Sequence, residues 1–306
     1  MSTDSVALPR PDLPTLFLAL GVYAAFGLLT WFHHDLPWWL VAILGGYIVA
    51  LHGSLQHEAV HGYPFRDHWL TEATVFPSLW LWLPFEYYRQ AHLAHHHDER
   101  LTCPLTDPES NYVAPSTWAT MGPVHQTVRR LLTTLAGRLV LGPFYAAWTV
   151  VRRLAYALLE GNVAHLKLWI EHVPAVAVVL IWVTVVCHIP LWQYLLLYVY
   201  PALSLTLLRS YAEHRAASDV RQRTATVRTN LVMGLLYAFN NYHILHHAEP
   251  ATPWYRRPAR YRLRQAELDA ANGGYVIEGY SELFRRYLFR GKESAVHPFA
   301  GRGFPQ

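Results

Sequence analysis

Charged residues are scarce in this chain of 306 residues. Asp, Glu, Lys and Arg make up only 15% of it, while 53% is hydrophobic, and soluble domains usually carry about a quarter charged residues. This deficit favours a protein embedded in a lipid bilayer over a soluble one. No Gly/Ser-rich or Pro-rich linker divides the sequence. We therefore expect one membrane-embedded domain over residues 1–306, with no nucleic-acid partner.

Cysteine is almost absent. Cys103 and Cys187 are too few for a disulfide framework, a zinc ribbon or an iron–sulfur cluster held by four thiolates. Any redox metal must therefore be bound by other side chains. The sequence offers an unusual number of one candidate ligand, since it contains 19 histidines.

Long apolar runs are plentiful. Residues 13–32 and 36–56 are each close to the roughly 20 residues that cross about 30 Å of hydrocarbon. Residues 173–208 contain no charged side chain and are interrupted at Cys187 to Pro190, where proline can end one helix and start another. We expect spans at 173–188 and 191–208. The predicted fold is an all-α integral membrane protein with four transmembrane helices in two hairpins.

The basic residues indicate how the chain is oriented. Every lysine and arginine lies outside the two short turns near Asp35 and His188. By the positive-inside rule, both turns face away from the cytoplasm. Residues 57–172 and 209–306 should then form a helical cytoplasmic cap. We expect the protein in the inner membrane of a bacterium, with its active site on the cytoplasmic side.

Histidines cluster just beyond the predicted spans. His57 and His61 are four residues apart, which places them on one face of a helix. The motif His-x-x-His-His occurs twice, starting at His92 and at His243, and a single His214 follows the fourth span. The candidate ligands are His57, His61, His92, His95, His96, His214, His243, His246 and His247.

The number of candidate ligands predicts the number of metals. One metal takes about four to six ligands, so the nine histidines indicate two metal ions. His97 should point away from the face that its neighbours share. Isolated histidines such as His33, His34 and His188 are interpreted as structural.

Acidic residues accompany the clusters, notably Glu58, Asp98 and Glu213. Histidines that bind metals usually donate their second N–H to such groups, which fixes the tautomer. The alternative is that these residues are ordinary surface charges of the cap.

The motifs resemble those of the membrane fatty acid desaturase and hydroxylase superfamily, the di-iron enzymes with histidine boxes. The likeness covers roughly residues 57–258. It comprises His-Glu-x-x-His-Gly from His57, His-x-x-His-His from His92, and Asn-Tyr-His-x-x-His-His from Asn241, with a pair of spans before the third box. The resemblance implies that the nine histidines hold two iron ions in the cap. It also implies dioxygen as co-substrate, and a water held by Asn240 or Asn241 as a further ligand.

The resemblance further implies a fatty acyl or similar lipid substrate and desaturation as the reaction. A separate electron donor of the ferredoxin, rubredoxin or cytochrome type is required, because the chain has no redox domain of its own. Trp80, Trp82 and Phe85 are candidates for the wall of an apolar substrate tunnel, with a core or interfacial role as the alternative. The arginine-rich segment 256–264 is a candidate docking or membrane-surface region.

Other functions are consistent with parts of the pattern. The same site would support hydroxylation, ketolation or oxidative decarboxylation. His57-Glu58-x-x-His61 is also the pattern of a zinc metalloprotease, with Glu58 as general base, but that reading leaves most of the clustered histidines without a role. A metal transporter would hold its ligands inside the spans rather than beyond their ends.

Overall fold

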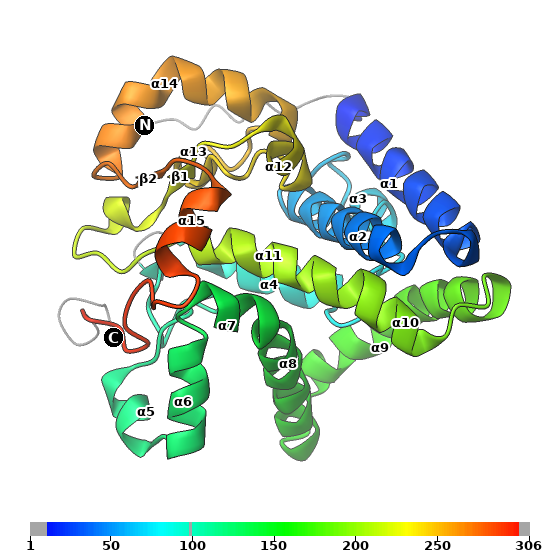
Figure 1. The fold of residues 1–306 in the computed structure, drawn as a ribbon, viewed down its shortest axis with the longest axis horizontal. Coiled ribbons are helices and arrows are strands. Elements are labelled where there is room, and N and C mark those ends of the chain that lie inside the picture. Colours follow the sequence, from blue (N-terminus) through cyan, green and yellow to red (C-terminus); the bar gives the residue numbers. More distant parts are fainter. Residues whose placement is uncertain (1–10, 98–99, 300–306) are drawn as a thin grey trace. The chain divides into compact units, whose positions relative to one another are not determined.

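A computed structural model describes residues 11–97 and 100–299, and these are mainly helical (Figure 1). The chain divides into two compact units. The first consists of Met1–Arg89 and Pro143–Thr206, and the second of Gln90–Gly142 and Leu207–Gln306. The boundaries between the units fall at or within helices, so neither unit is a continuous stretch of sequence.

Within the described residues, four helical segments are long and apolar enough to cross a bilayer. They are α1 (Leu13–Trp31), α2 (Trp38–Val60), α9 (Val163–Leu180) with its π-helical continuation η3 (Ile181–Val186), and the run of α10 (Leu191–Tyr194), π-helical η4 (Leu195–Val199) and α11 (Tyr200–Glu213). The predicted class, an all-α integral membrane protein with four spans, is confirmed.

The third of these segments starts earlier than the sequence suggested. Helix α9 begins at Val163 rather than at residue 173, because Asn162 caps it by accepting a hydrogen bond from the backbone N–H of His165 at 3.0 Å. The first turns of α9 contain Lys167 and Glu171, which form an ion pair of 3.6 Å four residues apart. Such a pair lets charged residues continue the helix.

Helices α1 and α2 lie side by side in the first unit, joined by the short turn η1 (His33–Asp35) (Figure 1). Helix α2 also packs closely against η4 and the start of α11. A Cβ atom added at Gly45 would lie 2.7 Å from the ring of Tyr198, and one at Gly46 would lie 2.8 Å from Pro201. Small residues therefore permit this approach of helix backbones, as is common in membranes.

The turn between α1 and α2 is tied to the second hairpin of the same unit. His33 is buried, with Nδ1 at 3.1 Å from the hydroxyl of Tyr198 and Nε2 at 2.9 Å from Oε1 of Gln193. The indole N–H of Trp182 donates to the hydroxyl of Thr30 at 2.9 Å. These contacts give His33 the structural role that the sequence predicted for it.

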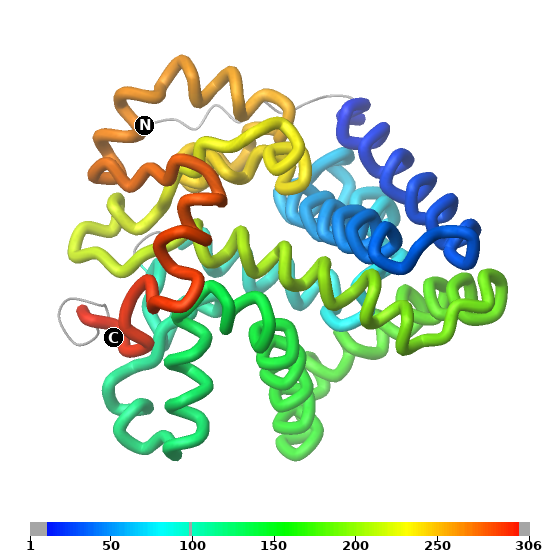
Figure 2. The backbone as a smooth tube through the Cα atoms, in the orientation of Figure 1, coloured from blue at the N-terminus to red at the C-terminus, as the bar shows by residue number. Residues whose placement is uncertain are grey.

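The described part of the second unit consists of shorter helices, which are visible as coils in Figure 2, and two short strands, which are labelled in Figure 1. Helix α3 (His68–Ala73) belongs to the first unit, and α4 (Phe85–His95) and α8 (Gly142–Leu159) lie across the boundaries. The remaining elements are α5 (Pro115–Thr120), α6 (Pro123–Leu131), α7 (Leu135–Val140), η5 (Val220–Arg223), β1 (Thr226–Val227), α12 (Leu231–Leu236), α13 (His243–Ala248), η6 (Trp254–Arg256), α14 (Arg257–Ala271), β2 (Val276–Ile277) and α15 (Tyr280–Tyr287).

Helix α13, which carries the third histidine box, is fixed by packing. Ile244 and Leu245 form a buried cluster with Tyr261 and Leu268 of α14. Strands β1 and β2 pair in parallel, and the backbone N–H of Ile244 donates to the carbonyl of Ala225, just before β1, at 3.1 Å. Burial of these apolar side chains, at roughly 25 cal/mol per Å², orients a helix that is too short to be stable alone.

Candidate metal centre

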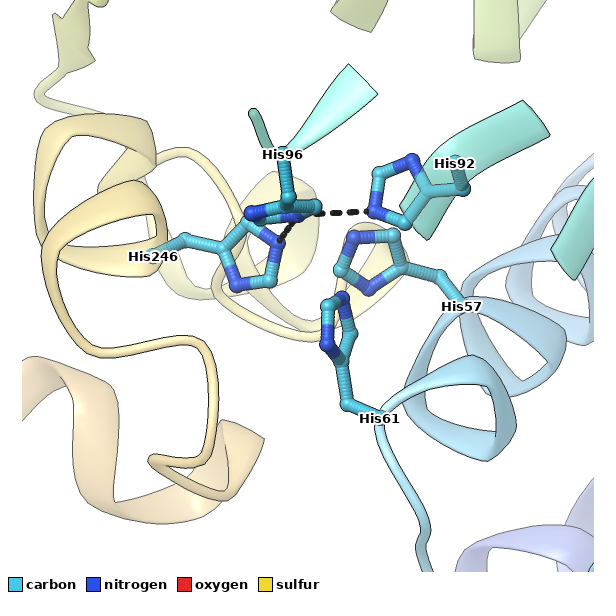
Figure 3. Close-up of side chains that lie close together, drawn as sticks. All are labelled: His57, His61, His92, His96 and His246. Carbon is cyan, nitrogen blue, oxygen red and sulfur yellow. Dashed lines mark hydrogen bonds between the residues drawn. The ribbon is translucent and has the colours of Figure 1, made fainter. Parts of the chain in front are cut away.

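The first histidine box lies at the end of α2 in the first unit. His57 and its neighbour Glu58 are almost fully buried, and His61 is the C-cap residue of the helix. The rings of His57 and His61 have their centroids 5.0 Å apart, and both side chains are drawn in Figure 3. The carboxylate of Glu58 lies 3.4 Å from Nδ1 of His57. The spacing of the box therefore produces a pair of adjacent imidazoles with a buried carboxylate beside them.

The second box lies at the end of α4. His92 and His95 occupy its last turn and are buried, His96 follows directly, and His97 is exposed. Successive residues of a helix are about 100° apart around its axis. The third and fourth residues after His92 therefore lie about 60° to one side of the His92 direction and about 40° to its other side. The structure shows this divergence. Nε2 of His96 lies 3.0 Å from Nε2 of His92, while Nε2 of His95 lies 3.0 Å from Nε2 of His214.

The third box divides in the same way. Nε2 of His246 lies 3.0 Å from Nε2 of His96 (Figure 3). Nε2 of His243 lies 2.9 Å from that of His214 and 3.1 Å from that of His247. Each His-x-x-His-His box thus contributes its first and last histidines to one set and its middle histidine to the other.

Two sets of histidines result in the second unit. In each set, one nitrogen of every ring lies within 4.8 Å of the others. The first set contains His92, His96 and His246, and the second contains His95, His214, His243 and His247. We call them the first and second histidine sets.

The spacing within the sets suits metal binding. At a metal–nitrogen distance of about 2.1 Å, two ligands at a right angle are about 3.0 Å apart. The contacts between neighbouring Nε2 atoms, such as those of His214 and His243 at 2.9 Å, match this value. These rings therefore stand at the separation that a shared metal ion imposes on its ligands.

The tautomers strengthen this argument. Nδ1 of His214 faces the carbonyl of Arg223 at 3.3 Å, and Nδ1 of His243 faces Oδ1 of Asn240 at 3.4 Å. Both Nδ1 atoms therefore carry the hydrogen, and the two facing Nε2 atoms present lone pairs to each other. Burial lowers the pKa of both His214 and His243 well below its ordinary value. Two neutral nitrogens that face each other in this way could both bind one cation.

Two carboxylates that the sequence analysis did not single out hold the second box. Asp107 accepts a hydrogen bond from Nδ1 of His95 at 2.9 Å, and Glu109 accepts one from Nδ1 of His92 at the same distance. The backbone N–H of Thr102 also donates to Asp107, at 2.8 Å. These contacts direct Nε2 of both histidines towards their sets, the usual role of a carboxylate behind a metal ligand.

The carboxylates also set the charge of the site. Burial disfavours the charged form of His95, but Glu109 and Asp107 outweigh it and raise the pKa of His95 to about 9. Burial likewise opposes ionisation of Glu109, yet His92 and His95 hold the pKa of its carboxyl below the ordinary value. The surroundings therefore favour positive charge beside these rings, and a metal ion would supply it.

Glu213 and Asn240 lie beside the second set, whereas Asn241 is used elsewhere. Oε1 of Glu213 accepts from Nδ2 of Asn240 at 3.2 Å and lies 3.4 Å from Nδ1 of His243. Nδ2 of Asn241 donates to the carbonyl of Val227 at 2.8 Å. Of the other predicted partners of the ligands, Asp98 lies outside the described residues.

The turn before the third box has unusual backbone angles. Ala238 and Phe239 have positive φ values of 47° and 53°, a conformation rare for residues with a side chain. The fully buried Arg257 stabilises this turn by donating to the carbonyl of Ala238 at 3.0 Å and to that of Thr252 at 3.1 Å. Strain of this kind persists where the surrounding structure enforces it, often at functional sites.

Much of the arginine-rich segment is therefore engaged within the protein. Besides the buried Arg257, Arg260 and Arg264 both form ion pairs with Glu249. Arg256 and Arg262 are exposed. Three of the five arginines proposed for docking thus have partners within the protein.

The aromatic side chains proposed for a substrate tunnel lie in the first unit. Trp80 and Phe85 are buried and Trp82 is half-buried, with the two indole rings 5.9 Å apart. A Cβ atom added at Gly53 would lie 2.8 Å from the ring of Trp80, which shows how closely this ring packs against α2. Phe85 also lines a cavity together with Gln56 and other residues of this unit.

Comparison with known proteins places the chain in a family. Residues 36–279 match the family described as fatty acid desaturase. The matched region includes all of the four candidate membrane-spanning segments except α1. It also includes all nine candidate histidines and the Asp107–Glu109 segment. No curated protein matches the chain significantly.

Proposed function

Because the chain belongs to the fatty acid desaturase family, we propose that it desaturates a fatty acyl or similar aliphatic chain at a di-iron centre. Family membership identifies an integral-membrane oxidoreductase of the desaturase and hydroxylase type that acts on acyl lipids. Which metal, which reaction and which residues are the parts that we add.

The observation that carries the proposal is the contact between neutral imidazoles. Nε2 of His214 and Nε2 of His243 lie 2.9 Å apart with their hydrogens on the opposite nitrogens. Imidazole nitrogens are good ligands for Fe²⁺. With the two histidine sets of the second unit, this favours one metal ion for each set.

We assign the histidines of the first box to the same centre. Three imidazoles from the first histidine set leave a metal short of the four to six ligands that it commonly takes. The sequence supplies His57 and His61 as a pair with the right spacing. The second set holds four imidazoles of its own, and Asn240 orients one of them.

Two irons held by these histidines would supply the activation of dioxygen that attack on an aliphatic C–H bond requires, chemistry that side chains alone do not perform. Asp107 and Glu109 keep the hydrogens of His95 and His92 on Nδ1, so that Nε2 stays available as a ligand. Burial of His92, His95, His243 and His246 keeps bulk water from the ligand atoms. Trp80, Trp82 and Phe85 are our candidates for the apolar wall along which the acyl chain lies.

The reaction needs electrons from outside. Removal of two hydrogens from the substrate and reduction of dioxygen to two waters require two electrons and two protons. Cys103 and Cys187 are both buried and unbridged and cannot form an iron–sulfur cluster by themselves. We propose a separate donor of the ferredoxin, rubredoxin or cytochrome type, acting on the cytoplasmic side of a bacterial inner membrane, where the positive-inside rule puts the cap.

The test is the mass of the product. The purified chain, loaded with iron, is incubated with a reductant, a donor protein, oxygen and candidate acyl lipids. Desaturation lowers the substrate mass by about 2 units, whereas hydroxylation by the same site raises it by about 16. Loss of two hydrogens supports the proposal. Oxygen insertion alone, or no oxygen-dependent product from any acyl lipid, contradicts it.

A further inference from the structure

The segment that follows α15 lies beyond the residues that match the family, which end at residue 279. We call residues 288–297 the C-terminal strap. It belongs to the same unit as the two histidine sets. Its side chains contact the backbone on both sides of His214, the one candidate ligand that no histidine box contains.

Lys292 holds the residue itself. Its ammonium group donates to the carbonyl oxygens of His214 and Tyr211, each at 2.6 Å, and is 3.0 Å from the hydroxyl of Tyr275. Only 12% of the side chain is exposed. All three hydrogens of the ammonium group thus have an acceptor. Two of the acceptors belong to the last turn of α11 and to the residue that follows it.

Glu293 holds the chain on the other side of the ligand. One of its carboxylate oxygens accepts the backbone N–H of Ala216 at 3.0 Å, and the other accepts the hydroxyl of Tyr112. Consecutive strap residues therefore bind the carbonyl of residue 214 and the N–H of residue 216. Rotation of the backbone around His214 would break one contact or the other.

The strap is itself anchored. The backbone N–H of Lys292 donates to the carbonyl of Thr133 at 2.9 Å, and a Cβ atom added at Gly291 would lie 2.7 Å from the hydroxyl of Thr133. Further along, the backbone N–H of Val113 donates to Ala295 at 2.9 Å. These contacts fix the strap on both sides of Lys292 and Glu293 and so hold the backbone of the two residues in place.

His214 is a single candidate ligand outside the boxes and follows the last residue of α11. Most histidines of the second and third boxes, by contrast, lie within α4 and α13. A bridge to Thr224 and a 3.3 Å contact from Nδ1 of His214 to the carbonyl of Arg223 hold this residue otherwise. A metal ligand that is free to move loses affinity, because binding must then order it.

We infer that Lys292 and Glu293 are positioning residues that place His214 for the metal of the second histidine set. The inference rests on the proposed metal centre. It assigns a function to a segment outside the matched family region, and it makes metal binding at one of the two sets, rather than at both, dependent on the C-terminal strap.

The test is metal binding by the full-length chain, purified in detergent and stripped of metal, during anaerobic titration with Fe²⁺. Lys292→Met keeps the length of the side chain and removes the charge and the donors. We expect it to weaken binding of one Fe²⁺ by about ten- to a hundredfold, the range for loss of a partner behind a metal ligand, and to leave the other unchanged. Arg286→Met, which breaks an exposed ion pair in α15, is the matched control and should bind both ions as the parent does.

The variant His214→Ala distinguishes a wrong ligand set from a wrong role for the C-terminal strap. If His214→Ala binds both ions with parent affinity, the proposed ligand set is wrong. If it weakens one ion and Lys292→Met weakens none, the ligand set stands and the role of the strap is refuted. The double variant should bind Fe²⁺ as His214→Ala does alone, because both changes act on one ligand.

A general loss of structure would give a different result. Weakening of both ions by Lys292→Met, or a further loss in the double variant, would overturn the inference. If Lys292→Met cannot be purified in folded form, Glu293→Gln provides the second test. It retains an oxygen that can accept from Ala216 but loses the charge, and we expect a smaller weakening at the same ion. Parent affinity for both ions in Glu293→Gln would then refute the inference.

Discussion

Nδ1 of His95 lies 2.9 Å from the carboxylate of Asp107, a residue twelve positions further along the chain. Since a carboxylate only accepts hydrogen bonds, this contact fixes the hydrogen of His95 on Nδ1 and leaves Nε2 to face His214. Asp107 is itself buried and held by the backbone N–H of Thr102. The second histidine set therefore depends on a residue that has no metal-binding motif around it.

Asp107→Asn should weaken Fe²⁺ binding by the second histidine set by about ten- to a hundredfold. The amide lacks the charge of the carboxylate and can present its N–H₂ group to the imidazole. Anaerobic Fe²⁺ titration measures the change. Asp219→Asn alters a half-buried carboxylate paired with Arg221 in the same unit, and this variant should bind Fe²⁺ as the parent does. Equal affinities for Asp107→Asn and the parent would mean that the carboxylate does not support a metal ligand.

The division of the boxes between two sets makes a prediction about pairs of substitutions. His96 and His246 belong to one set, whereas the adjacent His95 and His96 belong to different sets. The double variant His96→Ala with His246→Ala should weaken the binding of one metal ion only. The double variant His95→Ala with His96→Ala should weaken the binding of both. Each single variant, including His246→Ala, should lose iron and activity. Iron bound per chain at limiting Fe²⁺ separates these cases, and the same loss in both double variants would count against two separate sets.

His297 should make stability depend on pH. Burial, with a smaller contribution from the charge of Arg223, lowers the pKa of His297 to about 4. Its Nδ1 accepts the backbone N–H of Phe299 at 3.1 Å, so protonation there breaks the bond. Because the pKa is about 6.5 in the unfolded chain, the unfolded state binds more protons between pH 6.5 and 4. The stabilisation is complete above pH 6.5 and is lost as the pH falls towards 4.

The measurement is the thermal unfolding midpoint of the detergent-solubilised chain from pH 7.5 to 4.5, compared with that of His297→Gln. Nε2 of His297 lies 3.1 Å from the hydroxyl of Thr102. Glutamine retains a donor for this hydroxyl but does not titrate. The parent should lose more stability than the variant as the pH falls, and the gap between them should narrow. A gap that stays constant across this range would show that His297 does not titrate as described.

Arg257→Met should destabilise the second unit. The substitution removes the donors that the carbonyls of Ala238 and Thr252 use, and each buried acceptor left unpaired costs about 1–3 kcal/mol. The apparent unfolding midpoint in detergent measures the loss. Arg262→Met, an exposed residue of the same helix, should change stability by no more than about 0.5 kcal/mol. If both variants unfold alike, the buried arginine does not hold the turn before the third box.

Hydropathy and spacing predicted much of this protein. The four membrane helices follow from uncharged runs of sufficient length, and every histidine that the two sets contain lies in a predicted cluster or at His214. Local spacing on a helix is set by geometry alone, which is why His92 and His96 are found together. The same geometry implies that His95 and His96 diverge, because successive residues are about 100° apart around the helix axis. The prediction that His92, His95 and His96 share one face overlooked this divergence.

The remaining features depend on contacts between residues far apart in the sequence. Asp107 and Glu109 lie in an irregular segment that has no period linking it to His92 and His95. Lys292 reaches His214 across 78 positions, and no local pattern signals such a contact. The early start of α9 follows from the capping residue Asn162, since hydropathy alone places the beginning of a helix after its last charged residues.

The central claim is that the histidines hold two iron ions, and metal analysis of the purified full-length chain tests it most directly. The chain should be expressed with iron available, purified without chelators, and measured for iron and zinc together with its protein concentration. We predict about two irons per chain, with zinc well below one equivalent. One zinc and no iron would contradict the account and would instead fit a metalloprotease that uses His57, Glu58 and His61.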